Sequence, residues 1–125
     1  MEPNTADTMQ DFRNLKVWQK AHALTLAVYQ ATATFPTEER FGLTIQLRRT
    51  AATVPTSIAD GCGRGTDAEL RKCLSVAMGA AKQLEYQALL AHDLGYLPAA
   101  DHTRFSTEAV EVQRMLTGLM HTLNG

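Results

Sequence analysis

Positive side chains are the residues of this chain whose type and spacing most clearly suggest chemistry. Arg13, Lys16 and Lys20 recur at spacings of three and four, so they are expected to share one face of a helix. Arg48 and Arg49 add positive charge further along the chain. Such a face can bind the phosphates of RNA or an acidic protein. The alternative is an ordinary solvated face, which the formal net charge of −1 favours.

Ser57, Asp60 and Glu85 are the candidates for an internal polar site. Glu85 lies beside the apolar seam of its predicted helix, and Asp60 falls at a predicted helix end, where the helix dipole disfavours an acid. Each acid is therefore expected to have a cationic partner, for which Arg48 or Arg49 is available. Such a pair would fix the register of the helices more than it would add stability. We expect a structural role, with a functional pocket as the alternative.

Paired metal ligands and catalytic constellations are missing from the sequence. The four histidines do not pair at the spacing of helix-borne ligands, and the Glu-x-x-His motif of ferritin-like metal sites does not occur. The glycine-rich run 61–65 lacks the Lys-Ser/Thr of a P-loop. Cys62 and Cys73 show no pairing with a histidine, so free thiols are expected. The sequence therefore predicts no metal, no cofactor and no enzymatic activity.

Composition favours one helical domain. The chain has 125 residues, enough for a single core, and its 45% hydrophobic content includes only 6% aromatic residues. The apolar residues are therefore largely Ala and Leu, which suit closely packed helices. The sequence contains no run of ~20 apolar residues and no secretory signal at its N-terminus. A cytoplasmic location is expected.

Helix signals divide the chain into a tail, 1–10, and a bundle domain, 11–125. A first helix over 12–34 is expected after an N-cap at Asp11, and a second, ending near 61, after a cap at Thr37. The sequence Thr66-x-x-Glu69 is a capping box that predicts a third helix to about 93, and a fourth follows over 99–123. Long helices joined by short loops predict an all-α, antiparallel up-down-up-down four-helix bundle.

A proline interrupts the second predicted helix. Apolar residues recur along one face of this segment: Leu43, Leu47, Ala51, Val54 and Ile58. Pro55 removes one backbone N–H and pushes against the carbonyl of Ala51, which costs about 3 kcal/mol in an isolated helix. Packing on more than one side must offset that cost. Nearby Ser57 and threonines 50, 53 and 56 are expected to bond to carbonyls that the kink frees.

Two further patterns predict contacts between helices. The first helix carries a second stripe beside its apolar one, composed of Trp18, His22, Thr25 and Tyr29. Together the two stripes form a wide face, as a helix with two neighbours needs. In the third helix, the small residues around Gly79 predict a close approach of another helix.

Three motifs carry a resemblance to a known family: DFRNLKVWQKAH, FPTEERFGLTIQLRR and VPTSIADG. Over about 11–97 the chain resembles the four-helix bundle protein family, also called the intervening-sequence or S23 ribosomal protein family. The resemblance implies a bundle that commonly assembles as a homopentamer and has no known enzymatic activity. A related group, the accessory proteins of diversity-generating retroelements, is strongly basic and binds nucleic acid and a reverse transcriptase.

The leading hypothesis is a non-enzymatic bundle that binds copies of itself in a ring and acts as a binding or scaffolding subunit. Its ring contacts are expected to use apolar surface left over after the bundle closes, with the wide face of the first helix as one candidate. The alternative is an RNA-binding or reverse-transcriptase accessory protein.

Overall fold

The computed structural model describes residues 11–124, and the predicted tail 1–10 lies outside them. The described chain is helical and contains no strand. Its elements are η1 (Phe12–Asn14), α2 (Lys16–Thr32), η2 (Thr37–Glu39), α3 (Leu43–Cys62), α4 (Asp67–Asp93) and α5 (Ala99–His121). The elements η1 and η2 are short 3-10 helices.

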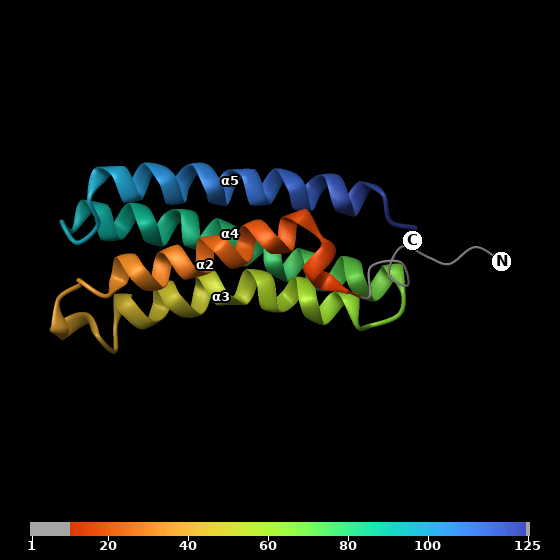
Figure 1. The fold of residues 1–125 in the computed structure, drawn as a ribbon, viewed down its shortest axis with the longest axis horizontal. Helices are drawn as coiled ribbons and strands as arrows, with labels where there is room; N and C mark the ends of the chain where they lie inside the picture. Colours follow the sequence, from red (N-terminus) through yellow and green to blue (C-terminus); the bar gives the residue numbers. More distant parts are fainter. Residues whose placement is uncertain (1–10, 125) are drawn as a thin grey trace.

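The four long helices lie side by side, and helices that follow one another in the chain run in opposite directions (Figure 1). On α2 and α3, Thr25 bonds to Ala51 while the later Thr32 bonds to the earlier Arg48, as an antiparallel pair requires. The all-α, four-helix fold predicted from the sequence is confirmed.

The core runs through the bundle as two adjoining clusters of buried side chains. All five apolar residues predicted to share a face of α3 are buried, and so are the residues along one face of α2: Val17, Ala21, Leu24 and Val28. No helix in the described part of the chain has the length and apolar character needed to cross a bilayer.

The first helix begins later than the sequence predicted. Asp11 is a cap, but the helix it caps is the single 3-10 turn η1, where its carboxylate accepts a hydrogen bond from the Arg13 N–H at 3.1 Å. Leu15 is then extended (φ −80°, ψ 125°), which lets its side chain pack against the core. This break separates Arg13 from α2.

The start of the second helix was also misplaced. Thr37 opens η2, and α3 begins only at Leu43, after Gly42 adopts a conformation that no helix contains (φ −112°, ψ −113°). Glu39 caps α3 by accepting the Leu43 N–H at 3.1 Å. The hydroxyl of Tyr96, from the loop after α4, donates to the same carboxylate at 3.1 Å and helps to hold it.

The boundaries of α4 follow the sequence. The Thr66 hydroxyl accepts the Glu69 N–H at 3.2 Å, so the predicted N-cap is confirmed. Gly95 follows the C-cap in the left-handed region (φ 83°), where its N–H donates to the His92 carbonyl. Together these caps set the length of the longest helix.

The glycine that a close helix approach requires is Gly61, whereas Gly79 within the predicted small-residue cluster faces open space. A Cβ on Gly61 would sit 2.9 Å from the Cβ of Cys73 and 2.7 Å from a Leu70 methyl group, whereas one on Gly79 would meet nothing within 4 Å. The other members of that cluster, at positions 77, 80 and 81, are alanines buried in the core. Gly61 therefore lets the end of α3 press against the start of α4.

Candidate functional site

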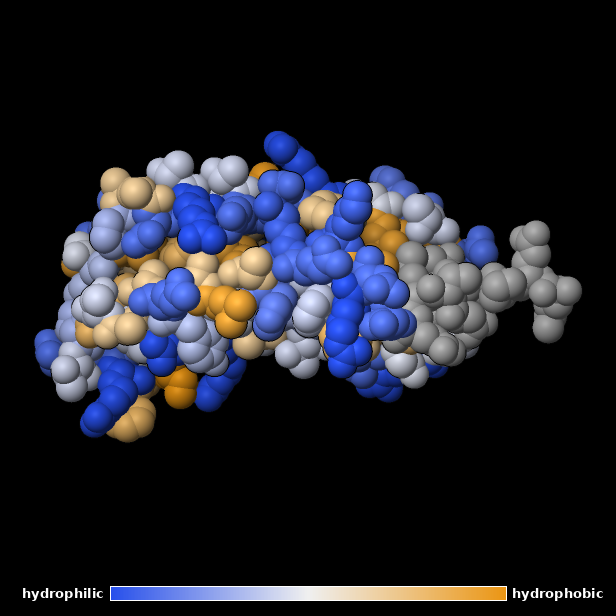
Figure 2. All heavy atoms as spheres, viewed as in Figure 1, coloured by the Kyte–Doolittle hydropathy of each residue, from blue (hydrophilic) through white to orange (hydrophobic). Residues whose placement is uncertain are grey.

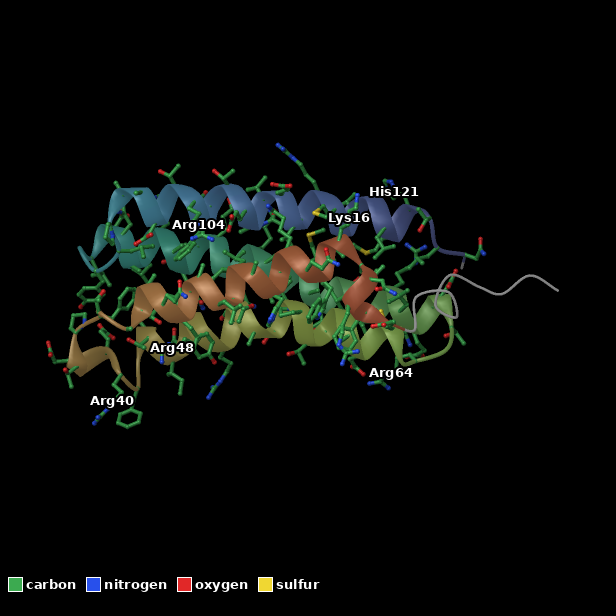
Figure 3. The ribbon with its side chains drawn as sticks, viewed as in Figure 1. Lys16, Arg40, Arg48, Arg64, Arg104 and His121 are labelled. Atoms are coloured by element: carbon green, nitrogen blue, oxygen red, sulfur yellow. The ribbon has the colours of Figure 1, made fainter. Side chains whose placement is uncertain are left out.

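The predicted basic face is not formed as one surface. Arg13 belongs to η1 and lies 3.5 Å from the Asp11 carboxylate, outside the helix that carries Lys16 and Lys20. Lys20 lies 3.2 Å from Glu111 of α5, so its charge is compensated. Lys16, labelled in Figure 3, is exposed near the start of α2.

Arg48 joins the end of α2 to α3. Its Nε donates to the Thr32 hydroxyl at 2.7 Å, and its Nη2 donates to the Tyr29 carbonyl at 3.0 Å. The guanidinium also lies over the Tyr29 ring, 4.8 Å from the centroid. A cation at a helix C-terminus is favourable to the helix dipole, so Arg48 stabilises the α2–α3 pair. Its neighbour Arg49 is exposed.

The predicted pairing of Asp60 with Arg48 or Arg49 is wrong. Asp60 is exposed and forms a bidentate pair with Arg64, one helical turn later, at 3.0 and 3.1 Å. The local spacing of four residues makes this pair geometrically easier than one along the length of α3. The hydrogen bond from Arg64 lowers the pKa of Asp60 from its ordinary value.

Cys73 approaches the same carboxylate, with its Sγ 3.7 Å from Asp60 Oδ2. Burial, followed by the negative charge of Asp60, raises the pKa of the Cys73 thiol. Burial also raises the pKa of Cys62. Both cysteines are free, and neither has the lowered pKa of a nucleophilic thiol.

Glu85 also has partners other than the predicted arginines. It accepts a hydrogen bond from the buried Gln113 of α5 at 3.0 Å and lies 3.7 Å from Lys82. Glu85 is twelve residues beyond Cys73 on α4, roughly 18 Å of helical rise. The structure therefore does not bring Glu85 together with Asp60, and Ser57 is half-buried on α3.

The carbonyl that Pro55 frees is satisfied by a neighbouring helix. The single O–H of Thr25 is shared between two carbonyls, that of Ala21 in its own helix at 2.8 Å and that of Ala51 in α3 at 3.0 Å. The expectation that hydroxyls close to Pro55 would do this is wrong, since Thr53 bonds to the Arg49 carbonyl. Pro55 and Thr25 are both buried, so α2 supplies the packing that the kink needs.

A shallow apolar groove lies along the same two helices, and we call it the α2–α3 groove. Its volume is about 370 Å³, and its lining residues are Phe12, Trp18, His22, Thr25, Ala52, Pro55, Thr56 and Ala59. The Trp18 and His22 rings stack with centroids 4.9 Å apart, and Phe12 lies 4.8 Å from Trp18. Three rings therefore flank a floor of small side chains.

Further apolar side chains are exposed on α2 and α3 beyond this groove. Leu26 is 52% exposed, Tyr29 45% and Ile45 37%. Figure 2 shows apolar side chains in orange between hydrophilic ones in blue on the face viewed there.

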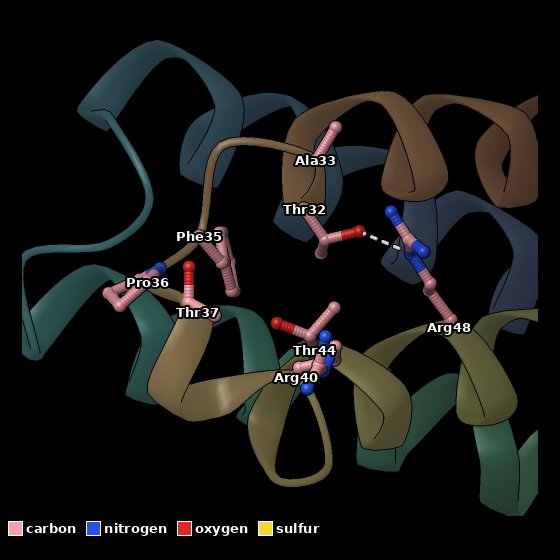
Figure 4. Close-up of a pocket in the computed structure, with 8 residues that line it drawn as sticks. All are labelled: Thr32, Ala33, Phe35, Pro36, Thr37, Arg40, Thr44 and Arg48. Atoms are coloured by element: carbon pink, nitrogen blue, oxygen red, sulfur yellow. Dashed lines mark hydrogen bonds between the residues drawn. The ribbon is translucent and has the colours of Figure 1, made fainter.

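A second hollow, polar in character, lies where α2 ends and α3 begins (Figure 4). We call it the Arg–Thr pocket. Its volume is about 290 Å³, and its lining residues are Thr32, Ala33, Phe35, Pro36, Thr37, Arg40, Thr44 and Arg48.

The structure brings together one pair of histidines that the sequence did not predict to be neighbours. His92 at the end of α4 and His102 near the start of α5 stack with ring centroids 4.7 Å apart, and His92 Nδ1 lies 2.9 Å from the Leu97 carbonyl. The tight α4–α5 turn was the signal that could have paired them. The two rings are nearly parallel, with 12° between their planes, so their nitrogen lone pairs lie in parallel planes and do not converge on one point. This stacked arrangement does not suit a shared metal ion. Among the described residues, no three His, Cys, Asp or Glu side chains are placed to hold a metal.

Comparison with known proteins agrees with this fold. A family model described as "23S rRNA-intervening sequence protein" matches residues 13–118. A crystal structure from Bacteroides thetaiotaomicron VPI-5482, of a protein with unknown function from the S23 ribosomal protein family, has a TM-score of 0.78. It is 17% identical, and the match covers 85% of this chain and 96% of that chain. Among curated proteins there was no match.

Proposed function

The chain belongs to the 23S rRNA-intervening sequence protein family, and from that premise we propose that it is a non-enzymatic subunit that binds copies of itself. The assembly is a closed ring, a homopentamer, that acts as a binding or scaffolding unit. We place it in the cytoplasm, where its two free cysteines remain reduced.

The observation that carries this proposal is the α2–α3 groove. The rings of Phe12 and Trp18 are only partly buried and His22 is exposed, and all three flank a groove of small residues, with Trp18 also packing against the core. Aromatic side chains are enriched in the cores of protein interfaces, and apolar surface outside a finished core marks interaction sites. A copy that fills this groove would bury surface that the single chain leaves in water.

Light scattering at micromolar concentration tests the proposal, with five copies as the expected result. Thr56 lines the groove and is exposed, so Thr56→Glu places a charge in the contact without disturbing the core. We expect this variant to be a folded monomer. Thr107→Glu, a change at another exposed threonine, on α5, is the matched control and should assemble normally. A wild-type protein that is monomeric at these concentrations would refute the assembly.

The alternative function, RNA binding or assistance to a reverse transcriptase, has less support. Arg13 and Lys20 have acidic partners, and Arg48 is bonded to α2. Only Lys16 and Arg49 of the predicted set are then left without such contacts among the described residues. Filter binding with structured RNA tests this alternative, because the electrostatic contribution is largest at low salt. Strong binding at low salt by the wild type would favour it over scaffolding alone.

A further inference from the structure

We propose that the Arg–Thr pocket binds an oxoanion of the phosphate class, either free phosphate or the phosphate of a small ester. The pocket is separate from the α2–α3 groove, and the two share no lining residue. Its walls come from the end of α2 and the loop that follows it, from η2 with the turn after it, and from the first turns of α3.

No carboxylate among the described residues pairs with the positive charge in this pocket. Arg40 and Arg48 line it, and none of its eight lining residues is acidic. Within residues 11–124, no carboxylate lies within 4.0 Å of either guanidinium. The nearby Glu39 directs its two oxygens to other donors, the Leu43 N–H and the Tyr96 hydroxyl. An anion would thus meet two positive charges and no direct acidic competitor.

Arg48 is already held in place for such a ligand. Its Nε and Nη2 donate to α2, and its guanidinium lies over the Tyr29 ring, so the side chain loses little freedom on binding. Its Nη1 forms no hydrogen bond within residues 11–124, and Figure 4 shows the guanidinium beside Thr32 at the edge of the pocket. Arg40 lines the rim of the pocket and is exposed, with its guanidinium over the Phe41 ring.

Two hydroxyls complete the set of donors. Thr37 and Thr44 line the pocket, and their hydroxyls form no hydrogen bond with any residue in 11–124. A phosphate monoester carries about −1.5 to −2 charges at pH 7 and several acceptor oxygens, which matches two guanidiniums and two hydroxyls. The pocket is at the small end of the usual range for ligand sites, so it suits a phosphate better than a large cofactor.

Titration with inorganic phosphate, followed by NMR at constant ionic strength adjusted with chloride, tests this proposal. We expect saturable shifts of the Arg48 Nε–H signal and of the Thr44 amide, with a dissociation constant on the order of 1 mM. Arg40→Gln should weaken binding by roughly tenfold, as expected for a lost charge-assisted hydrogen bond. Arg49→Gln removes an equal charge one residue beyond the pocket lining and should change the affinity by less than about twofold.

The outcomes separate a site from general attraction of anions. Absence of saturation up to about 50 mM phosphate, or equal losses in the two arginine variants, would overturn the proposal. Thr44→Val provides a second readout, since it removes one donor without changing the charge and should also weaken binding. Titration with a nucleoside monophosphate identifies the source of the phosphate: tighter binding than phosphate, lost in Arg40→Gln, supports an ester, and equal binding supports free phosphate.

Discussion

At the residue scale, the hydroxyl of Thr25 makes a proline inside α3 tolerable. Pro55 has no N–H for the Ala51 carbonyl, and a buried carbonyl without a partner costs about 1–3 kcal/mol. The Thr25 hydroxyl lies 3.0 Å from that carbonyl and shares its single hydrogen between it and the Ala21 carbonyl at 2.8 Å. The apolar packing around Pro55 and this one polar contact together offset the interruption.

Thr25→Val tests this role because it keeps the shape of the side chain and removes only the donor. We expect the free energy of unfolding in urea to fall by about 1–3 kcal/mol. Thr53→Val is the control, since the Thr53 hydroxyl bonds to a carbonyl of its own helix. Thr53→Val should lower the free energy of unfolding by less than about 0.5 kcal/mol.

A double-mutant cycle makes the test specific. Pro55→Ala restores a backbone N–H that can donate to the Ala51 carbonyl. Thr25→Val should therefore lower the free energy of unfolding less in that background than in the wild type. Equal losses in both backgrounds would show that the Thr25 contact does not compensate for the proline.

The Asp60–Arg64 pair predicts a change in titration. Its hydrogen bond lowers the pKa of Asp60 in the folded protein, so Arg64→Gln should move that pKa back towards its ordinary value. NMR of the Asp60 carboxyl carbon measures this shift directly. Because the folded pKa is the lower one, the pair stabilises the fold above the unfolded pKa, and this contribution disappears as the pH falls through the folded pKa. An unchanged Asp60 pKa in Arg64→Gln would contradict the assignment.

At the element scale, Gly61 controls how closely α3 approaches α4. A methyl group there would lie 2.9 Å from the Cβ of Cys73, which cannot move without its helix. Gly61→Ala should therefore lower the unfolding free energy by about 1–3 kcal/mol, although alanine favours the helix. Thermal or urea unfolding measures the loss.

Gly118→Ala is the matched control for this change. Gly118 is also inside a helix, but a Cβ there would meet nothing within 4 Å. We expect this variant to gain up to about 1 kcal/mol from helix propensity. A loss of stability of the same size in both variants would rule out close approach as the cause.

The elements also show what the sequence could and could not predict. Apolar periodicity identified the four helices and the buried faces of α3 and α4, because burial follows local spacing. The starts of α2 and α3 were misplaced, since they depend on contacts distant in the chain, such as Tyr96 with Glu39. The partners of Asp60 and Arg48, and the Arg–Thr pocket, depend in the same way on which helix ends meet.

At the scale of the whole molecule, the two hollows lie at different heights along the bundle. The α2–α3 groove ends near Thr25, and the Arg–Thr pocket begins at Thr32, seven residues or about 10 Å further along α2. Copies whose contact is confined to the groove would leave the pocket open. Assembly and anion binding are expected to be independent.

The monomeric Thr56→Glu variant checks that independence. We expect it to bind phosphate with the affinity of the wild type in the same NMR titration. A pocket completed by a second copy would instead lose its affinity in this variant, and the loss would be restored by conditions that force assembly.

The contact between Thr25 and the Ala51 carbonyl also bears on how the chain is made. Synthesis proceeds from the N-terminus, so Thr25 leaves the ribosome 30 residues before Pro55. The Thr25 hydroxyl on α2 is therefore already available when α3 emerges. The nascent α2–α3 hairpin can form without leaving the Ala51 carbonyl unpaired. A circular permutant that places α2 last would have to hold α3 open until the end of translation.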